Sequence, residues 1–310
     1  MKKLALTVLI SVASSISFAD NMAIFGDSYS DTGNLNSIST DLQYIMSVTD
    51  VYKQGILSDG DPALEIVAQN GNYETGTSLH FSGLAQGSNF AVGSARLTNL
   101  NPSYSLLSMT RQVSAFLISS YASDSKLAYV WIGINDVRDA AKTGVKKTIK
   151  SNIRLAVDVL KNELIRLDET SLTQVVVLPV PDTSLLPEID ILVDTYPTIV
   201  DDSQYASTLF NKLTKNMIKK LKKVVSYDLD FKPDFFDAFH GALNSFEDPK
   251  AYCKTLLITA PPLQPTDYCS DDVSALPQLP FADEIHPSAA LHKKTGGWLS
   301  VETPVASDKL

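Results

Sequence analysis

Ser28 is the first residue of the chain whose type and setting suggest chemistry. It follows the apolar run 22–25, and Gly26 allows a sharp turn into the polar segment 27–34. A short apolar run that ends at glycine is typical of a buried parallel strand. Ser28 is therefore predicted at the carboxyl end of that strand, where open α/β sheets bind ligands, and is a candidate nucleophile. Alternatively, Ser28 or Ser30 only caps a following helix, because serine is a common N-cap residue.

A candidate base lies in residues 283–287, whose sequence is DEIHP. Pro287 disfavours helix at His286 and suits the first turn of a following helix, so Asp283 and His286 are predicted in the loop before it. A separation of three residues on a turn lets the carboxylate fold back onto the imidazole, and a base oriented in this way can accept a serine proton. The alternative is an ordinary loop histidine, and His240 is a weaker competitor for the base.

Acyl transfer also needs hydrogen-bond donors for a developing oxyanion. The run 89–92 predicts a second strand that ends in Gly93 and Ser94, whose backbone N–H groups are candidate donors. The apolar run 127–134 predicts a third strand, and the side-chain amide of Asn135 follows it directly. Both sets of donors are predicted at the same sheet edge as the nucleophile. Taken singly, each has a simpler reading, namely a glycine turn and a helix cap.

The elements that must carry these residues alternate between strand and helix. Helical spacing of apolar residues marks segments 106–117, 149–167 and 209–221, and apolar runs at 175–180 and 224–229 predict a fourth and a fifth strand. This alternation predicts an α/β fold, a three-layer α/β/α sandwich with a parallel five-stranded sheet at its centre.

The first 19 residues have the pattern of a secretory signal peptide. Two lysines precede an apolar run, and small residues flank a cleavage point before Asp20. No later apolar run reaches the ~18 residues expected of a transmembrane helix. We therefore expect a secreted protein, periplasmic or extracellular, with no integral membrane segment after removal of residues 1–19. Residues 20–310 are predicted to form a single domain, because no linker stands out.

Net charge and cysteine content limit the kinds of ligand that the chain is expected to bind. The formal net charge of −9 argues against nucleic acid and suits neutral or zwitterionic substrates. Cys253 and Cys269 are an even pair in an exported chain, so they are predicted to form a disulfide that closes a loop insertion at 253–269. A metal site needs more ligands than this, and zinc and phosphate-loop motifs are missing from the sequence, so we expect no metal and no cofactor.

Four segments taken together resemble the signature blocks of the GDSL lipases, or SGNH hydrolases. In chain order they are 26–34 (GDSYSDTGN), 87–95 (GSNFAVGSA), 133–136 (GIND) and 283–287 (DEIHP). The resemblance spans residues 24–287 and implies the flavodoxin-like architecture of that family. It also implies the roles of the site residues, which are Ser28 as nucleophile and first oxyanion donor, Asn135 as side-chain donor, His286 as base and Asp283 as its orienter.

The chain departs from the family pattern at two positions. Tyr29 stands where the family name has leucine, which we expect to alter packing and not chemistry. The second block has Gly93-Ser94 where relatives have two glycines, and alignment places the oxyanion donor on Ser94. A backbone N–H survives this change, so the sequence leaves the choice between Gly93 and Ser94 open.

The longer forms of the first two blocks are similar to a secreted bacterial branch that includes lysophospholipases A and glycerophospholipid-cholesterol acyltransferases. The resemblance implies a monomeric hydrolase of lipid or lysolipid esters, with water or a sterol alcohol resolving the acyl-enzyme. Alternatives are a broad-specificity or carbohydrate-deacetylating carboxylesterase and, in a different class, an exported binding protein with inert residues. The loop 253–269 is either a lid that a protease opens after export or a structural staple.

Overall fold

The computed structural model describes residues 20–40, 43, 52–53, 55–100, 102–252 and 278–302, with the backbone alone at 102–104. The predicted signal peptide 1–19 and the predicted disulfide loop, including Cys253 and Cys269, lie outside the described residues. Both stay predictions, as does the division into a signal peptide and one domain.

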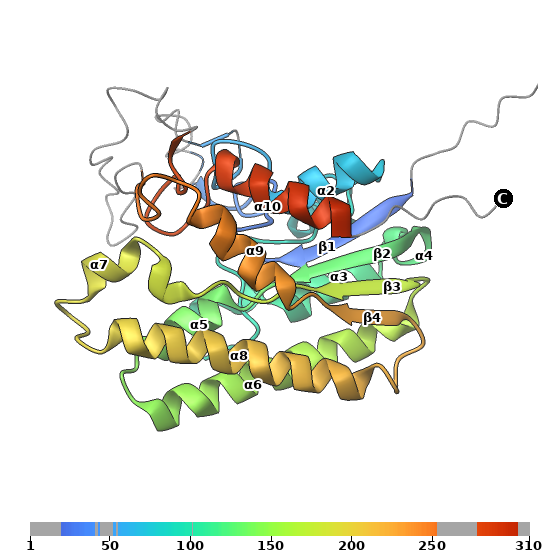
Figure 1. The fold of residues 1–310 in the computed structure, drawn as a ribbon. Helices are drawn as coiled ribbons and strands as arrows, with labels where there is room; N and C mark the ends of the chain where they lie inside the picture. Colours follow the sequence, from blue (N-terminus) through green and yellow to red (C-terminus); the bar gives the residue numbers. More distant parts are fainter. Residues whose placement is uncertain are drawn as a thin grey trace, which may run out of the picture.

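A parallel sheet forms the centre of the fold (Figure 1). Its four strands follow one another in space as they do in the sequence: β1 (Asn21–Gly26), β2 (Ser125–Trp131), β3 (Gln174–Val177) and β4 (Asp228–Phe231). The register pairs Phe25 with Val130, Val130 with Val177, and Val177 with Phe231, so the carboxyl ends of the strands share one edge. The residues that follow β1 and β2 are thereby brought to the same side of the molecule.

Helices cover both faces of this sheet, as the sequence predicts (Figure 1). One face carries α3 (Met109–Leu117), α5 (Ile134–Ala141), α6 (Lys146–Arg166) and α8 (Ile199–Leu221), and the other carries α2 (Ala63–Gly71), α9 (Asp234–Leu243) and α10 (Ala289–Glu302). The shorter elements are α4 (Tyr121–Asp124), α7 (Glu188–Leu192), η1 (His80–Ser82), η2 (Pro102–Leu107), η3 (Leu167–Glu169) and η4 (Thr183–Leu185). The predicted three-layer α/β/α sandwich is confirmed.

Helix α8 begins ten residues before the predicted segment 209–221. Its first half buries the polar side chains of Asp202, Ser203 and Ser207 next to the apolar Ile199 and Ala206. An apolar spacing rule does not detect a helix whose buried face is partly polar.

The prediction of five strands is wrong in one element. Segment 87–95 is not a regular strand, although it runs parallel to β1 along its free edge. Three backbone hydrogen bonds join the two segments: Ile24 N–H to Ser88 O (3.0 Å), Phe90 N–H to Ile24 O (2.8 Å) and Val92 N–H to Gly26 O (3.1 Å). The segment therefore occupies the place of a fifth strand, and the spatial order is still the flavodoxin-like one.

The side chain of Gln112 on α3 explains the interruption. Its Oε1 accepts from the Gly26 N–H at 3.0 Å, and its Nε2 donates to the Gly26 carbonyl at 2.8 Å. A regular parallel ladder would use the Gly26 N–H for the carbonyl of Phe90. Strand periodicity does not reveal a side-chain amide that enters the sheet edge from a neighbouring helix.

Replacing Gln112 with leucine should destabilise the fold at the end of β1. The Gly26 N–H would be buried without an acceptor, which costs about 1–3 kcal/mol, and a second hydrogen bond would also be lost. We expect the free energy of unfolding, measured by urea denaturation, to fall by about 2–4 kcal/mol. The control Arg111→Ala, at an exposed position of the same helix, should change it by less than about 0.5 kcal/mol. Equal stabilities of the Gln112→Leu variant and the wild type would contradict this account.

Candidate active site

Ser28 lies in a tight turn directly after β1. The N–H groups of Ser30 and Asp31 both donate to the carbonyl of Asp27 at 3.1 Å, which closes the turn. The Ser28 side chain makes no capping hydrogen bond within the described chain, and no regular helix starts at this point. Ser28 is 7 % exposed, so the residue is close to the surface but shielded. The helix-cap alternative for Ser28 is not supported.

Asp283 and His286 form a buried pair in the loop that leads into α10. His286 Nδ1 lies 2.6 Å from Asp283 Oδ2, and Asp283 Oδ1 accepts from the N–H groups of Ile285 and His286, each at 2.8 Å. The carboxylate therefore folds back on its own loop, as the three-residue spacing predicts. His240 has a different partner, since its Nε2 accepts from the Asp182 N–H at 3.2 Å.

A tyrosine that the sequence did not single out completes the environment of this carboxylate. Tyr52, 231 residues away in the chain, donates its hydroxyl to Asp283 Oδ2 over 2.5 Å. Burial alone would raise the pKa of Asp283, but the charge of a protonated His286 and hydrogen bonds from His286 and Tyr52 outweigh it and lower the pKa below 3.8. An ionised Asp283 only accepts, so the neutral form of His286 carries its proton on Nδ1 and leaves Nε2 as an acceptor.

Tyr29 joins the turn of Ser28 to the loop of His286. Its hydroxyl donates to the carbonyl of Ile285 at 2.7 Å, and its ring centroid lies 6.4 Å from that of His286. The departure from leucine therefore changes more than packing, because leucine cannot make this hydrogen bond. Within the described part of the chain, no hydrogen bond joins the Ser28 hydroxyl to the His286 ring. Catalytic hydrogen bonds are often long in the absence of substrate.

The second block supplies one free backbone donor. Gly93 donates its N–H to Asp31 Oδ2 at 2.7 Å, so this group is already used. The N–H of Ser94 has no acceptor among the described residues, and the backbone there is left-handed, with φ of 63°. A Cβ at position 93 would lie 2.5 Å from Leu35 Cδ2, so any larger residue there would require the Leu35 side chain to move. Of the two residues that the sequence left open, the geometry favours Ser94 as the donor.

Asn135 lies in the first turn of α5, at the end of β2. Gly133 before it has φ of 119°, which suits glycine alone. Asn135 Nδ2 donates to the carbonyl of Ala95 at 3.0 Å, and Asn135 Oδ1 accepts from Arg138 Nη1 at 2.9 Å. The second N–H of the amide has no acceptor in the described part of the chain. Asn135 thus lies inside the helix and does not cap it.

Two buried carboxyl groups lie close to these donors. Asp136 accepts from the N–H groups of Leu97 and Thr98, each at 2.9 Å, and burial raises its pKa to about 6. Asp27 is 2 % exposed, and burial raises its pKa to about 7. The nearby Asp136 adds to this rise, whereas a hydrogen bond from the Tyr29 N–H opposes it.

Two further residues of the first block hold the first and second blocks together. Asp31 accepts four backbone N–H groups, those of Gly33 (2.8 Å), Asn34 (2.6 Å), Leu35 (3.0 Å) and Gly93 (2.7 Å). Asn34 Nδ2 donates to the carbonyls of Asn89 (2.9 Å) and Ala91 (2.8 Å). Asp31 and Asn34, which belong to the longer form of the first block, therefore have structural roles that the sequence alone did not predict.

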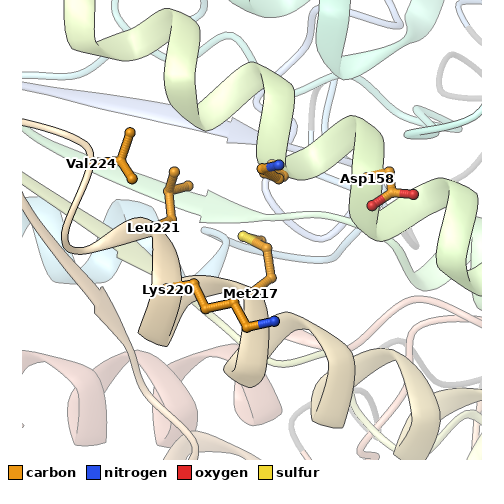
Figure 2. Close-up of a pocket in the computed structure, with 6 residues that line it drawn as sticks. Asp158, Met217, Lys220, Leu221 and Val224 are labelled. Atoms are coloured by element: carbon orange, nitrogen blue, oxygen red, sulfur yellow. The ribbon is translucent and has the colours of Figure 1, made fainter.

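Features that lie elsewhere do not contribute to this site. A pocket of about 350 Å³ between α6 and α8 is lined by Asp158, Lys161, Met217, Lys220, Leu221 and Val224 (Figure 2). Its lining residues lie in the second half of α6 and at or just after the end of α8, and these helices lead into the amino ends of β3 and β4, the edge opposite Ser28. Across the described ranges, no group of three His, Cys, Asp or Glu side chains is placed to hold a metal ion. The helices of those ranges include none that is both long and apolar enough to cross a membrane.

Comparison with known proteins identifies the family. Residues 22–299 match the family model described as GDSL-like lipase/acylhydrolase, so the chain belongs to this family of carboxylic ester hydrolases. No curated protein matched the sequence. A solved structure from Parabacteroides merdae ATCC 43184, provisionally named a GDSL-like lipase, is similar at 14% identity and a TM-score of 0.39, covering 92% of this chain and 95% of the other.

Replacing Tyr52 with phenylalanine should weaken the fold in a pH-dependent way. A hydrogen bond to a charged group contributes about 1.5–3 kcal/mol, so we expect that loss in the free energy of unfolding at pH 7. The folded pKa of Asp283 lies below its usual 3.8, so the contribution is complete above pH 3.8 and is lost as the pH falls through the folded pKa. Denaturation at pH 7 and at pH 3 measures both effects.

Tyr227→Phe is the matched control, because the Tyr227 hydroxyl donates to a neutral group, the carbonyl of Leu164, at 2.6 Å. Its effect should be the same at both pH values. A loss in Tyr52→Phe that does not shrink in acid would contradict the role given to Tyr52.

Asp27→Asn should flatten the pH dependence of stability. The folded pKa of Asp27 is raised from 3.8 to about 7, so the folded protein binds more protons than the unfolded chain between these values. Stability from this group is present below pH 3.8 and is lost as the pH rises towards 7. The variant should therefore lose less stability than the wild type between pH 5 and pH 8, measured by urea denaturation. Parallel curves would refute this prediction, and the exposed Asp194→Asn should give such a parallel curve.

Proposed function

We propose that the chain hydrolyses acyl ester bonds of lipids through a covalent acyl-enzyme on Ser28. The observation that carries this proposal is the buried Asp283–His286 pair, 2.6 Å apart, tied through Tyr29 to the turn that holds Ser28. An ionised carboxylate that fixes the Nδ1–H tautomer leaves Nε2 as the general base. Catalysis is assigned to Ser28, His286 and Asp283, with no metal and no cofactor.

In the proposed reaction, the Ser28 hydroxyl attacks the ester carbonyl carbon while His286 Nε2 takes its proton. The oxyanion accepts hydrogen bonds from the N–H groups of Ser28 and Ser94 and from the side-chain amide of Asn135. When the intermediate collapses, the bond to the alcohol breaks and His286 protonates the leaving oxygen. Water then attacks the acyl-enzyme, His286 takes a proton from the water, and Ser28 is released with its proton restored.

We choose Ser94 over Gly93 as the oxyanion donor because only one of the two backbone N–H groups already has an acceptor. The Gly93 N–H is held by Asp31, and a donor used in the resting protein is not available to an oxyanion. The Ser94 N–H follows it directly on a left-handed backbone. Serine in place of glycine at position 94 keeps this donor, because the donor is the backbone N–H.

For the substrate we propose lysophospholipid or phospholipid, with a sterol alcohol as a second acyl acceptor besides water. The support is the likeness of the first two sequence blocks to the secreted bacterial branch and the acidic chain, which suits zwitterionic lipids. Export after removal of residues 1–19, a monomeric state and protease opening of the loop 253–269 belong to the same proposal.

The direct test compares three substrates on the chain without residues 1–19. We expect long-acyl lysophosphatidylcholine to be hydrolysed faster than p-nitrophenyl butyrate and an acetylated sugar. Ser28→Ala should lose at least about 10³-fold in kcat and should not be labelled by a serine-reactive fluorophosphonate, because the nucleophile is absent. The Ser30→Ala variant, two residues along the same turn, is the control that keeps Ser28.

Three other outcomes would each contradict a part of this proposal. A preference for the acetylated sugar would replace the lipid proposal with a carbohydrate-deacetylating esterase. Labelling that persists in Ser28→Ala would remove Ser28 as the nucleophile. A wild-type protein that is neither labelled nor active would favour an exported binding protein on this scaffold.

A further inference from the structure

We propose that Arg138, held by Glu188, is a positioning residue that sets the orientation of the Asn135 amide. This inference rests on the proposed function, in which that amide is an oxyanion donor. It assigns a role to two residues outside the four sequence blocks, one on α5 and one at the start of α7.

The contact between Arg138 and Asn135 has only one possible polarity. Arg138 lies one helical turn after Asn135 and approaches its amide with Nη1, at 2.9 Å from Oδ1. A guanidinium has donors and no acceptor, so the amide atom that faces it must be the oxygen. The amide nitrogen is thereby directed to the other side, where one N–H reaches the carbonyl of Ala95 at 3.0 Å. The second N–H stays available for substrate.

Arg138 Nη1 is the one donor to the Asn135 oxygen among the described contacts, so without Arg138 the amide is held only by the hydrogen bond from its nitrogen to the Ala95 carbonyl. An amide turned by 180° would present Oδ1 to the substrate oxygen, and two acceptors repel each other there. The difference matters most in the transition state, because the charge on the substrate oxygen develops only at that point. A loss of Arg138 should therefore lower kcat and leave KM nearly unchanged.

Arg138 is itself held in place by Glu188. Arg138 Nε donates to Glu188 Oε1 at 2.9 Å, and Nη2 donates to Oε2, which makes a bidentate pair. The side chains are 13% and 8% exposed, so water competes little with this pair. Burial opposes ionisation of Glu188, but the charge and hydrogen bonds of Arg138 prevail and lower its pKa. Planar bidentate pairs of this kind fix geometry better than a single lysine contact does.

The backbone of Glu188 links this pair to the base. Its N–H donates to the carbonyl of Glu284 at 3.0 Å, and Glu284 follows Asp283 directly. The ion pair thus lies between the loop of His286 and the helix of Asn135. A purely structural ion pair would not need the contact from Arg138 to the Asn135 amide.

A double-mutant cycle separates positioning from stability. We expect Asn135→Ala to lower kcat on p-nitrophenyl butyrate about 10²–10³-fold, as loss of an oxyanion donor does elsewhere. Arg138→Met should lower kcat at least about 10-fold with KM within about twofold, because the donor is present but misdirected. When Arg138→Met is added to Asn135→Ala, kcat should fall by less than about threefold further, because the amide it orients is gone.

Two further variants control for an effect of Arg138→Met on folding. Arg166→Met removes another arginine–glutamate pair, Arg166 to Glu163 at 2.6 Å on α6, and should leave kcat unchanged. If Arg138→Met does not fold, Glu188→Gln takes its place in the cycle, because it removes the charge and keeps the shape. It should lower kcat in the wild type and have little effect in Asn135→Ala.

The outcomes distinguish this inference from the proposed function. If Arg138→Met or Glu188→Gln lowers kcat in the Asn135→Ala background as much as it does in the wild type, the positioning role is wrong and the ion pair is only structural. An Asn135→Ala variant as active as the wild type would instead overturn the oxyanion role of Asn135, and the inference with it. Unchanged kcat in Arg138→Met alone would overturn the inference and leave the proposed function standing.

Discussion

The arrangement of the site depends on a carboxylate that is buried and fully hydrogen-bonded. Asp283 accepts two backbone N–H groups on one oxygen, and the His286 ring and the Tyr52 hydroxyl on the other. A buried charge is expensive unless it is paired and satisfied in this way. Because those donors come from the loop before α10 and from Tyr52 far away in the chain, the imidazole has a fixed tautomer and a fixed direction. The role proposed for Ser28 requires that Nε2 of this ring reach the Ser28 hydroxyl during the reaction.

Some backbone N–H groups near the site already donate hydrogen bonds within the fold, and this determines which N–H groups remain without an acceptor. Gln112 takes the Gly26 N–H, and Asp31 takes that of Gly93. Each of these bonds breaks a regular pattern and fixes a turn at the carboxyl edge of the sheet. The N–H of Ser94 and one N–H of Asn135 stay without an acceptor in the described chain. A polar site next to a well-satisfied framework is the arrangement that preorganised catalysis requires.

The sequence predicted the layers, the parallel sheet and the carboxylate–histidine contact, because each depends on local spacing. Asp283 and His286 are three residues apart, and short apolar runs identify buried strands. The broken fifth strand, Tyr52 and the Arg138–Glu188 pair were not predicted. These three depend on side chains that meet across 50 to 231 residues, and no periodicity or motif records such contacts. The polar first half of α8 was missed for a different reason, since its buried face is not apolar.

The central claim is that Ser28 is activated by the Asp283–His286 pair and faces the donors on Ser94 and Asn135. A crystal structure of the protein inactivated by a fluorophosphonate tests this claim most directly. The account predicts phosphorus bonded to Ser28 Oγ, with a phosphonyl oxygen about 2.7–3.1 Å from Ser94 N and Asn135 Nδ2. His286 Nε2 should lie within hydrogen-bond reach of the Ser28 oxygen. An adduct on another residue, or a phosphonyl oxygen turned away from both donors, would contradict it.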